Sequence, residues 1–255
     1  MRAFGGFKVG EEFFYGEVRG TEVQRLAKAP WLGIAPAGAL VPLKDVQIDL
    51  PVAPSKLIAA GLNYASHIAE MKRTATGAPL IWFKAPSSLL PHGGIIEIAF
   101  PEHQTHFEVE LTIVIGKVAK NVSVDAALEH VFGYTIGQDI SDRDLQTAEK
   151  QFGRPKSFDT YTPMGPFIYT GVDVADLPIT LRQNGEVRQQ ARTSQMIHSV
   201  AEIVAFASVG MTLYPGDVIL TGTPSGVGPI TAGDRLEASI GDWTALRNNV
   251  AFAGK

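Results

Sequence analysis

Glycine and proline interrupt this chain at short intervals, which favours short strands and tight turns over long helices. The sequence contains 26 Gly and 16 Pro among 255 residues, and many of them separate short runs of alternating apolar and polar residues. Helical spacing of apolar residues is confined to segments 64–73, 124–131, 141–150 and 199–209. The sequence therefore predicts a β-dominated α/β protein.

Two units are expected along the chain. Residues 1–54 are predicted to form a small β-rich N-terminal domain, which ends in the proline-containing stretch 50–54. Residues 55–255 are predicted to form a second, larger domain. The total length is sufficient for a substantial hydrophobic core without disulfide bonds.

Composition excludes several classes of function. There are 22 Lys and Arg against 26 Asp and Glu, with no basic run, so a nucleic-acid-binding surface is not expected. The longest uncharged stretches, 31–43 and 203–216, are shorter than the roughly 20 apolar residues that span a bilayer. The N-terminus lacks the apolar core of a secretory signal, so we expect a cytoplasmic protein. The absence of cysteine excludes a thiolate nucleophile and a cysteine-ligated zinc.

Residues 106–116, HFEVELTIVIG, are the most informative segment, because their β-branched and aromatic content predicts a strand. Side chains alternate along a strand, so Glu108 and Glu110 are expected on one face. Two adjacent carboxylates repel each other unless a cation or protons lie between them, and a hard divalent cation with oxygen ligands meets that need. The alternative is the solvent-exposed face of an edge strand.

Asp139 adds a third carboxylate. It ends the apolar run 131–139, at a position that suits either a metal ligand or a helix N-cap. Three carboxylates without a cysteine ligand favour Mg²⁺ or Mn²⁺, with coordination positions left for water and substrate.

His67 and Glu70 are spaced i, i+3 in a predicted helix that Asn63 would cap, so they share one helical face. A carboxylate beside a histidine fixes the imidazole tautomer and raises its basicity, as a general base requires. The alternative is an exposed surface ion pair. The small residues 74–77 that follow suggest that this helix acts as a mobile lid.

Two lysines and a glycine-rich loop are candidates for binding an anionic substrate. Lys84 lies in an apolar run and Lys156 in a turn-rich one, and the alternative for both is an ammonium that extends to solvent. Segment 220–228, LTGTPSGVG, includes Gly222 and Thr223 and lacks the Gly-Lys-Ser/Thr of a P-loop. Its amides and hydroxyls suit a carboxylate, and a plain tight turn explains the pattern equally well.

Several motifs, in the same order along the chain, resemble the fumarylacetoacetate hydrolase family, in particular its acylpyruvase-like and hydroxyheptadienedioate-isomerase-like members. The matching segments are GLNYASHIAEM at 61–71, HFEVELTIVIGK at 106–117, GYTIGQDISDRDLQ at 133–146, PKSFDTYTPMGP at 155–166, NGEVRQ at 184–189 and GDVILTGTPSGVG at 216–228. The resemblance covers roughly residues 55–250. The chain departs from the family pattern at Ser66, Asp142 and His92.

The resemblance implies a catalytic domain of the mixed β-roll type over residues 55–255, with a small N-terminal domain over residues 1–54. It also implies a homodimer. Glu108, Glu110 and Asp139 match the family's metal ligands, which implies one Mg²⁺ or Mn²⁺ per subunit.

The resemblance further implies that His67 and Glu70 activate water, and that Lys156 faces the substrate. The positions that match the lining of a 2-oxo-acid pocket are Arg143, Gln146 and Thr223. The activity so implied is hydrolysis of a carbon–carbon bond in a 2,4-dioxo acid such as an acylpyruvate, in which the metal stabilises the departing enolate.

Three alternatives remain open from the sequence. The family also contains 2-oxo-acid decarboxylases and 2-hydroxyhepta-2,4-diene-1,7-dioate isomerases, which share the enolate chemistry, and the His67–Glu70 pair favours hydrolysis over isomerisation. A metal-binding module without turnover would explain the three carboxylates, but it would leave His67, Glu70 and Lys156 without a role.

Overall fold

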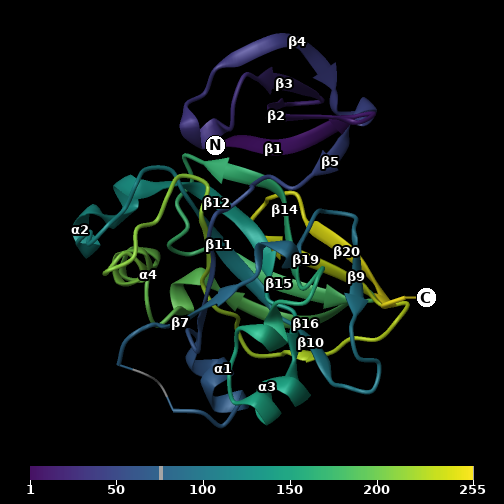
Figure 1. Cartoon of the computed structure of the whole chain (residues 1–255), viewed down its shortest axis with the longest axis vertical. Helices are drawn as coiled ribbons and strands as arrows, with labels where there is room; N and C mark the ends of the chain where they lie inside the picture. Colours follow the sequence, from purple (N-terminus) through teal and green to yellow (C-terminus); the bar gives the residue numbers. More distant parts are fainter. Residues whose placement is uncertain (75–76, 255) are drawn as a thin grey trace.

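The computed structural model describes residues 1–74 and 77–254, and within these residues the chain forms three β-sheets (Figure 1). The largest sheet has the order β4-β3-β2-β1-β14-β12-β11-β17-β6-β7, with β5 beside β1 and β8 beside β14. Its strands are β1 (Arg2–Val9), β2 (Glu12–Arg19), β3 (Glu22–Leu26), β4 (Pro36–Pro42), β5 (Gln47–Asp49), β6 (Leu57–Gly61), β7 (Leu80–Lys84), β8 (Leu89–Leu90), β11 (Val109–Ile115), β12 (Val131–Gln138), β14 (Thr162–Thr170) and β17 (Val218–Leu220).

Two smaller sheets complete the strand-dominated fold, which confirms the predicted fold class. A three-stranded sheet consists of β10 (Thr105–Phe107), β13 (Ser141–Asp142) and β18 (Gly228–Pro229). A five-stranded sheet consists of β9 (Ile95–Ile98), β15 (Pro178–Gln183), β16 (Glu186–Arg192), β19 (Arg235–Ile240) and β20 (Leu246–Phe252).

The N-terminal strands lie at one end of the molecule, opposite the end that carries α1 and α3 (Figure 1). They are hydrogen-bonded to the rest of the chain, since β1 pairs antiparallel with β14. Phe7 of β1 and Phe14 of β2 are both buried, and their rings stack with centroids 5.8 Å apart. The boundary after residue 54 stays a prediction.

The centre of the largest sheet is fully buried. Every residue of β11 is buried, and this strand lies between β12 and β17, so it has no solvent-exposed face. Apolar side chains fill both sides of it, which is why the sequence of this strand is nearly continuous in Val, Ile and Leu. Glu110 is therefore in the interior of the protein.

The helices are short: α1 (Ala65–Glu70), α2 (Val124–Ala127), α3 (Arg143–Glu149) and α4 (Val200–Ala207), with 3₁₀ turns at Pro30–Leu32, Leu43–Asp45, Pro86–Ser88, Leu128–His130, Arg154–Lys156 and Thr193–Gln195. Ser123 and Ser199 accept backbone N–H groups as N-caps of α2 and α4. No helix among the described residues is long and apolar enough to cross a membrane.

The predicted N-cap of α1 is wrong. The helix begins one residue later than an Asn63 cap requires, and its N-cap is Tyr64, whose side chain makes no capping bond. The Asn63 amide instead donates to the carbonyls of His198 and Thr221 and accepts the backbone N–H of His198. These long-range bonds attach the start of α1 to two distant segments.

Candidate active site

Three buried carboxylates meet at the junction of two sheets. Glu108 lies in the break between β10 and β11, Glu110 is on β11, and Asp139 follows β12, which pairs with β11. The Asp139 backbone N–H donates to the Glu108 carbonyl at 3.0 Å. One oxygen from each of the three side chains lies within 4.8 Å of the others. The side chains are at most 3% exposed, so the alternative of a solvent-exposed strand face is wrong.

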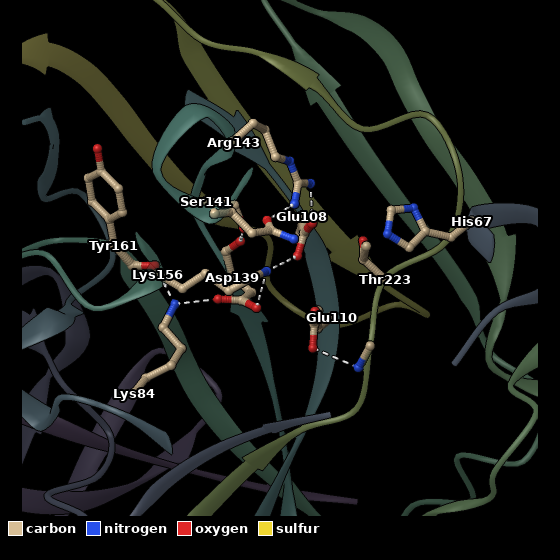
Figure 2. Close-up of polar contacts among 12 residues, drawn as sticks. His67, Lys84, Glu108, Glu110, Asp139, Ser141, Arg143, Lys156, Tyr161 and Thr223 are labelled. Atoms are coloured by element: carbon tan, nitrogen blue, oxygen red, sulfur yellow. Dashed lines mark hydrogen bonds and ion pairs between the residues drawn. The ribbon is translucent and has the colours of Figure 1, made fainter. Parts of the chain in front are cut away.

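Three cations surround this carboxylate cluster (Figure 2). Lys84 Nζ lies 2.5 Å from Asp139 Oδ1, and Lys156 Nζ lies 2.6 Å from Asp139 Oδ2 and 2.8 Å from Glu108 Oε2. Arg143 Nη2 forms an ion pair with the other oxygen of Glu108. Both lysines are 2% exposed, so neither extends to solvent.

Glu110 is the carboxylate without a cationic partner among the described residues. Its Oε2 accepts the backbone N–H of Gly222 at 2.7 Å. Burial, together with the charges of Asp139 and Glu108, raises the pKa of Glu110 well above its usual range. Burial also opposes ionisation of Glu108, but the charges of Arg143 and Lys156 hold its pKa well below the usual range.

This donor set fits a hard divalent cation. Three carboxylates offer only oxygen ligands, and Glu110 forms no ion pair with a cation among the described residues. Glu108, Glu110 and Asp139 would hold the ion, which supplies the missing charge. When the three carboxylates and the three surrounding cations are all ionised, their net charge is zero. A bound divalent cation would then give the site a net positive charge, which favours an anionic ligand.

His67 and Glu70 form the expected pair on α1. His67 Nδ1 lies 3.0 Å from Glu70 Oε2, and the other oxygen of Glu70 accepts the backbone N–H of Gly226 at 2.9 Å. His67 is 6% exposed, which is not what an exposed surface ion pair shows. With Nδ1 donating to the carboxylate, Nε2 is left as the proton acceptor. The predicted hinge includes residues 75 and 76, which lie outside the described residues, and the lid stays a prediction.

A hydrogen-bonded loop closes the other side of the carboxylate cluster. Gly222 has φ of 96°, and a Cβ there would lie 2.7 Å from Asn63 Cβ, so only glycine presents its N–H to Glu110. Thr223 Oγ1 donates to the carbonyl of Val109 at 2.9 Å. The fully buried Gln189 accepts the N–H of Val109 and donates to Thr223 Oγ1, which ties the loop to the strand of Glu110.

A cavity of about 500 Å³ opens onto these groups. Eight of the residues selected from the sequence line it: His67, Glu108, Glu110, Arg143, Gln146, Lys156, Gly222 and Thr223. Three other residues selected from the sequence do not line the cavity. Glu70 contacts His67, and Lys84 contacts Asp139. Lys84, expected to contact the substrate, donates to Asp139 and to the carbonyl of Tyr161 at 2.9 Å.

Sequence reasoning missed the remainder of the cavity wall and the hydrogen bonds beneath it. The wall also includes Met71, Lys72, Arg73, Leu80, Trp82 and Phe152. Gln189 was quoted only as part of a motif. Met71, Lys72 and Arg73 directly follow Glu70 in the predicted helix 64–73, and Trp82 is close to Lys84 in the sequence, so these positions offered a signal. Leu80 and Phe152 share no local pattern with the selected residues.

Comparisons with known proteins agree with this arrangement. Residues 56–251 match the model of the fumarylacetoacetate (FAA) hydrolase C-terminal family. This chain is a member of the fumarylacetoacetate hydrolase family. The structure is similar to that of 2-hydroxyhepta-2,4-diene-1,7-dioate isomerase from Mycobacterium marinum, with a TM-score of 0.92, 37% identity and full coverage of both chains.

Two relatives carry the name oxaloacetate tautomerase. The Bacillus subtilis protein YisK is 39% identical over 224 residues, which covers 82% of this chain and 74% of that protein. The mitochondrial protein FAHD1 of Arabidopsis thaliana is 40% identical over 192 residues, which covers 73% of this chain and 86% of that protein. These three similar proteins carry isomerase and tautomerase names, and a further similar structure, that of a protein from Exiguobacterium antarcticum with a TM-score of 0.87 and 33% identity, carries the name fumarylacetoacetate hydrolase.

Proposed function

We propose that this protein is a divalent-metal-dependent enzyme that moves a proton on a 2-oxo acid, as a keto–enol tautomerase or double-bond isomerase. The observation that carries the proposal is that His67, held by Glu70, lines the same cavity as Glu108 and Glu110. A basic imidazole beside an oxygen-ligand cluster is the arrangement that enolisation of a 2-oxo acid requires. The tautomerase and isomerase names of the relatives support the same chemistry.

The metal, when bound, withdraws electron density from the 2-oxo oxygen and so acidifies the neighbouring C–H bond. Lys156 and Arg143 face the substrate carboxylate with positive charge, and the Thr223 hydroxyl lines the same cavity. His67 Nε2 takes the proton from C3, which leaves an enolate, and returns it to the oxygen or to another carbon of the same molecule. Glu70 orients the imidazole and stabilises its positive charge in between.

Hydrolysis of a carbon–carbon bond is the second candidate, and the same His67–Glu70 pair would serve it as a general base. His67 would then deprotonate a water molecule that attacks the distal carbonyl of a 2,4-dioxo acid, and the bond would break with release of an enolate. Decarboxylation of oxaloacetate would also pass through an enolate. A metal-binding module without turnover is disfavoured, because His67 is buried against Glu70 beside the cluster.

Parallel assays with Mg²⁺ or Mn²⁺ distinguish these reactions. Proton exchange at C3 of oxaloacetate, cleavage of acylpyruvates and isomerisation of hydroxydienedioates would each be followed by NMR. The proposal expects metal-dependent exchange that His67→Ala lowers by about 10²–10⁴ without weakening metal binding. His198→Ala is the control, since His198 does not line the cavity. Cleavage without faster exchange would favour the hydrolase, and no turnover of any substrate would favour the binding module.

A further inference from the structure

A second cavity, of about 510 Å³, opens on the solvent-exposed face of the five-stranded sheet. Its lining comes from β15, β19 and β20, from the turn that follows β15, and from Gly93 (Figure 1). It shares no lining residue with the cavity of the candidate active site. Its volume is in the range of sites that bind small molecules (about 300–1,000 Å³). The proposed function gives this cavity no role.

The strand register brings four charged side chains together on this face. Arg182 and Arg247 both lie directly opposite Glu237, on the two strands that flank β19. Arg235 precedes Glu237 by two residues on β19, so its side chain is on the same face. The three arginines are exposed, and both sequence neighbours of each one are buried. The lining of the cavity therefore carries three positive charges and one negative charge.

Two of the three guanidinium groups are already oriented by the protein. Arg182 Nη1 donates to the Gly185 carbonyl at 3.1 Å. Asn184 and Gly185 have positive φ of 56° and 89°, as in the tight two-residue turns that join antiparallel strands, and they connect β15 to β16. Arg247 Nε lies 2.7 Å from Glu237 Oε2. An oriented guanidinium group loses less side-chain entropy when it binds a ligand.

The third guanidinium group, that of Arg235, has no partner among the described residues. Its side chain forms no ion pair or hydrogen bond with them, although its backbone N–H donates to Asn184 Oδ1 at 2.9 Å. The neighbouring acid, Asp234, is buried, and its oxygens accept hydrogen bonds from Gln183, Asn184 and Thr231. The cavity thus presents an unpaired guanidinium group beside two that are held in place.

We infer that this second cavity binds a phosphate group, held by Arg182, Arg235 and Arg247. A carboxylate has two oxygens, and a single guanidinium fork occupies both of them. A phosphate group has three acceptor oxygens and up to two negative charges, which suits three guanidinium groups beside one glutamate. The inference is independent of the proposed function. A simpler role for the charged row is stabilisation of the sheet by cross-strand charge pairs.

Calorimetry on the full chain with saturating Mg²⁺ separates these roles. The ligands are inorganic phosphate, glycerol 3-phosphate and, as the carboxylate control, acetate. Arg235→Gln removes the unpaired guanidinium group, and it should fold because Arg235 is exposed. Lys120→Gln is the control, since Lys120 is exposed and lines neither cavity. Arg143→Gln reports any phosphate that binds in the candidate active site instead.

Arg235→Gln should bind the phosphate ligands about tenfold more weakly than the wild type, while Lys120→Gln and Arg143→Gln should change their affinity less than about twofold. Acetate should bind the wild type at least about tenfold more weakly than phosphate. Tighter binding of glycerol 3-phosphate than of inorganic phosphate would identify a phosphate monoester as the ligand, and the reverse order would identify the free ion.

Three results overturn the inference. No binding of either phosphate ligand to the wild type would leave the arginines with the structural role alone. Wild-type affinity in Arg235→Gln, with a loss in Arg143→Gln, would place the phosphate in the candidate active site. Equal weakening in Arg235→Gln and Lys120→Gln would show a general attraction of anions to surface cations and no specific site.

Discussion

Lys84 and Asp139 form an ion pair in the interior of the protein, with 2.5 Å between Nζ and Oδ1 and both side chains inaccessible to solvent. Burial lowers the pKa of Lys84, while the charge of Asp139 opposes that shift. A buried ion pair of this kind is costly to break, because the remaining charge has no water around it. This pair therefore links the stability of the fold to the charge state of the carboxylate cluster.

Lys84→Met should destabilise the metal-free protein by about 3–5 kcal/mol, because Asp139 loses one of its two ammonium partners. Saturating Mn²⁺ should recover part of this loss by supplying positive charge to the same carboxylate. Urea unfolding with EDTA and with Mn²⁺ measures both effects, and Lys117→Met, an exposed lysine, is the control. An equal loss with and without Mn²⁺ would argue against a cation beside Asp139.

Gly222→Ala should weaken metal binding about tenfold, because a Cβ there displaces the N–H that holds Glu110. Gly210→Ala is a matched control: Gly210 also has a positive φ, of 69°, but a Cβ there meets no atom within 4 Å. The control should lose only about 1 kcal/mol of stability from backbone strain and should keep its metal affinity. Titration with Mn²⁺ compares the two variants, and equal affinities would contradict the assigned role of Gly222.

His103 and His92, which lie outside the carboxylate cluster, should make the free energy of unfolding depend on pH in opposite directions. The hydrogen bond from His103 Nδ1 to Asp142 Oδ2, 2.7 Å long, raises the pKa of His103, and Asp142 also caps α3. Its contribution is therefore fully present below the unfolded pKa of about 6.5 and is lost as the pH rises through the raised folded value. Burial, followed by the charge of Arg247, lowers the pKa of His92, so its contribution is present above about 6.5 and is lost as the pH falls.

His103→Asn should flatten the decline of stability on the alkaline side of pH 6.5, and His92→Asn should flatten the decline on the acidic side. Urea unfolding of the three proteins between pH 5 and pH 8 (about the range in which histidine titrates) tests both signs. Each variant serves as the control for the other. Identical changes in both variants would show that the pH dependence arises elsewhere.

The carboxylate cluster was predictable because its members fall in local patterns. Two glutamates at i, i+2 within an apolar run, and an aspartate at the end of another, are visible without a structure. The strand predicted over residues 106–116 is divided in the structure, because the chain changes sheets at Glu108. His106 consequently lies on β10 in the three-stranded sheet and does not line the cavity.

The aromatic part of the cavity wall and the buried lysine–carboxylate contacts were not predictable from local patterns. Lys72, Trp82 and Phe152 lie far apart in the sequence, and only the packing of α1, β7 and the segment after α3 brings them to one cavity. Burial decides the role of Lys84, and no pattern distinguishes a lysine that pairs with an internal carboxylate from one that reaches solvent.

The homodimer, which the family resemblance implies, stays a prediction. The apolar run 203–214 offers little surface for a dimer contact, since Ile203, Val204 and Leu213 are fully buried within one chain. Phe206, Val209 and other apolar side chains near α4 remain exposed, with Val209 67% accessible. Light scattering should give twice 27.4 kDa, and Val209→Glu should lower that mass. A wild-type mass of one chain across micromolar concentrations would reject the dimer.

Binding of Mn²⁺, followed by electron paramagnetic resonance, tests the central claim most directly. The wild type should bind one ion per chain, while Glu110→Gln and Asp139→Asn should lose that binding and Glu97→Gln, on the exposed side of β9, should keep it. Circular dichroism would establish that the variants are folded. Wild-type Mn²⁺ affinity in folded Glu110→Gln and Asp139→Asn would contradict a metal site built from these carboxylates.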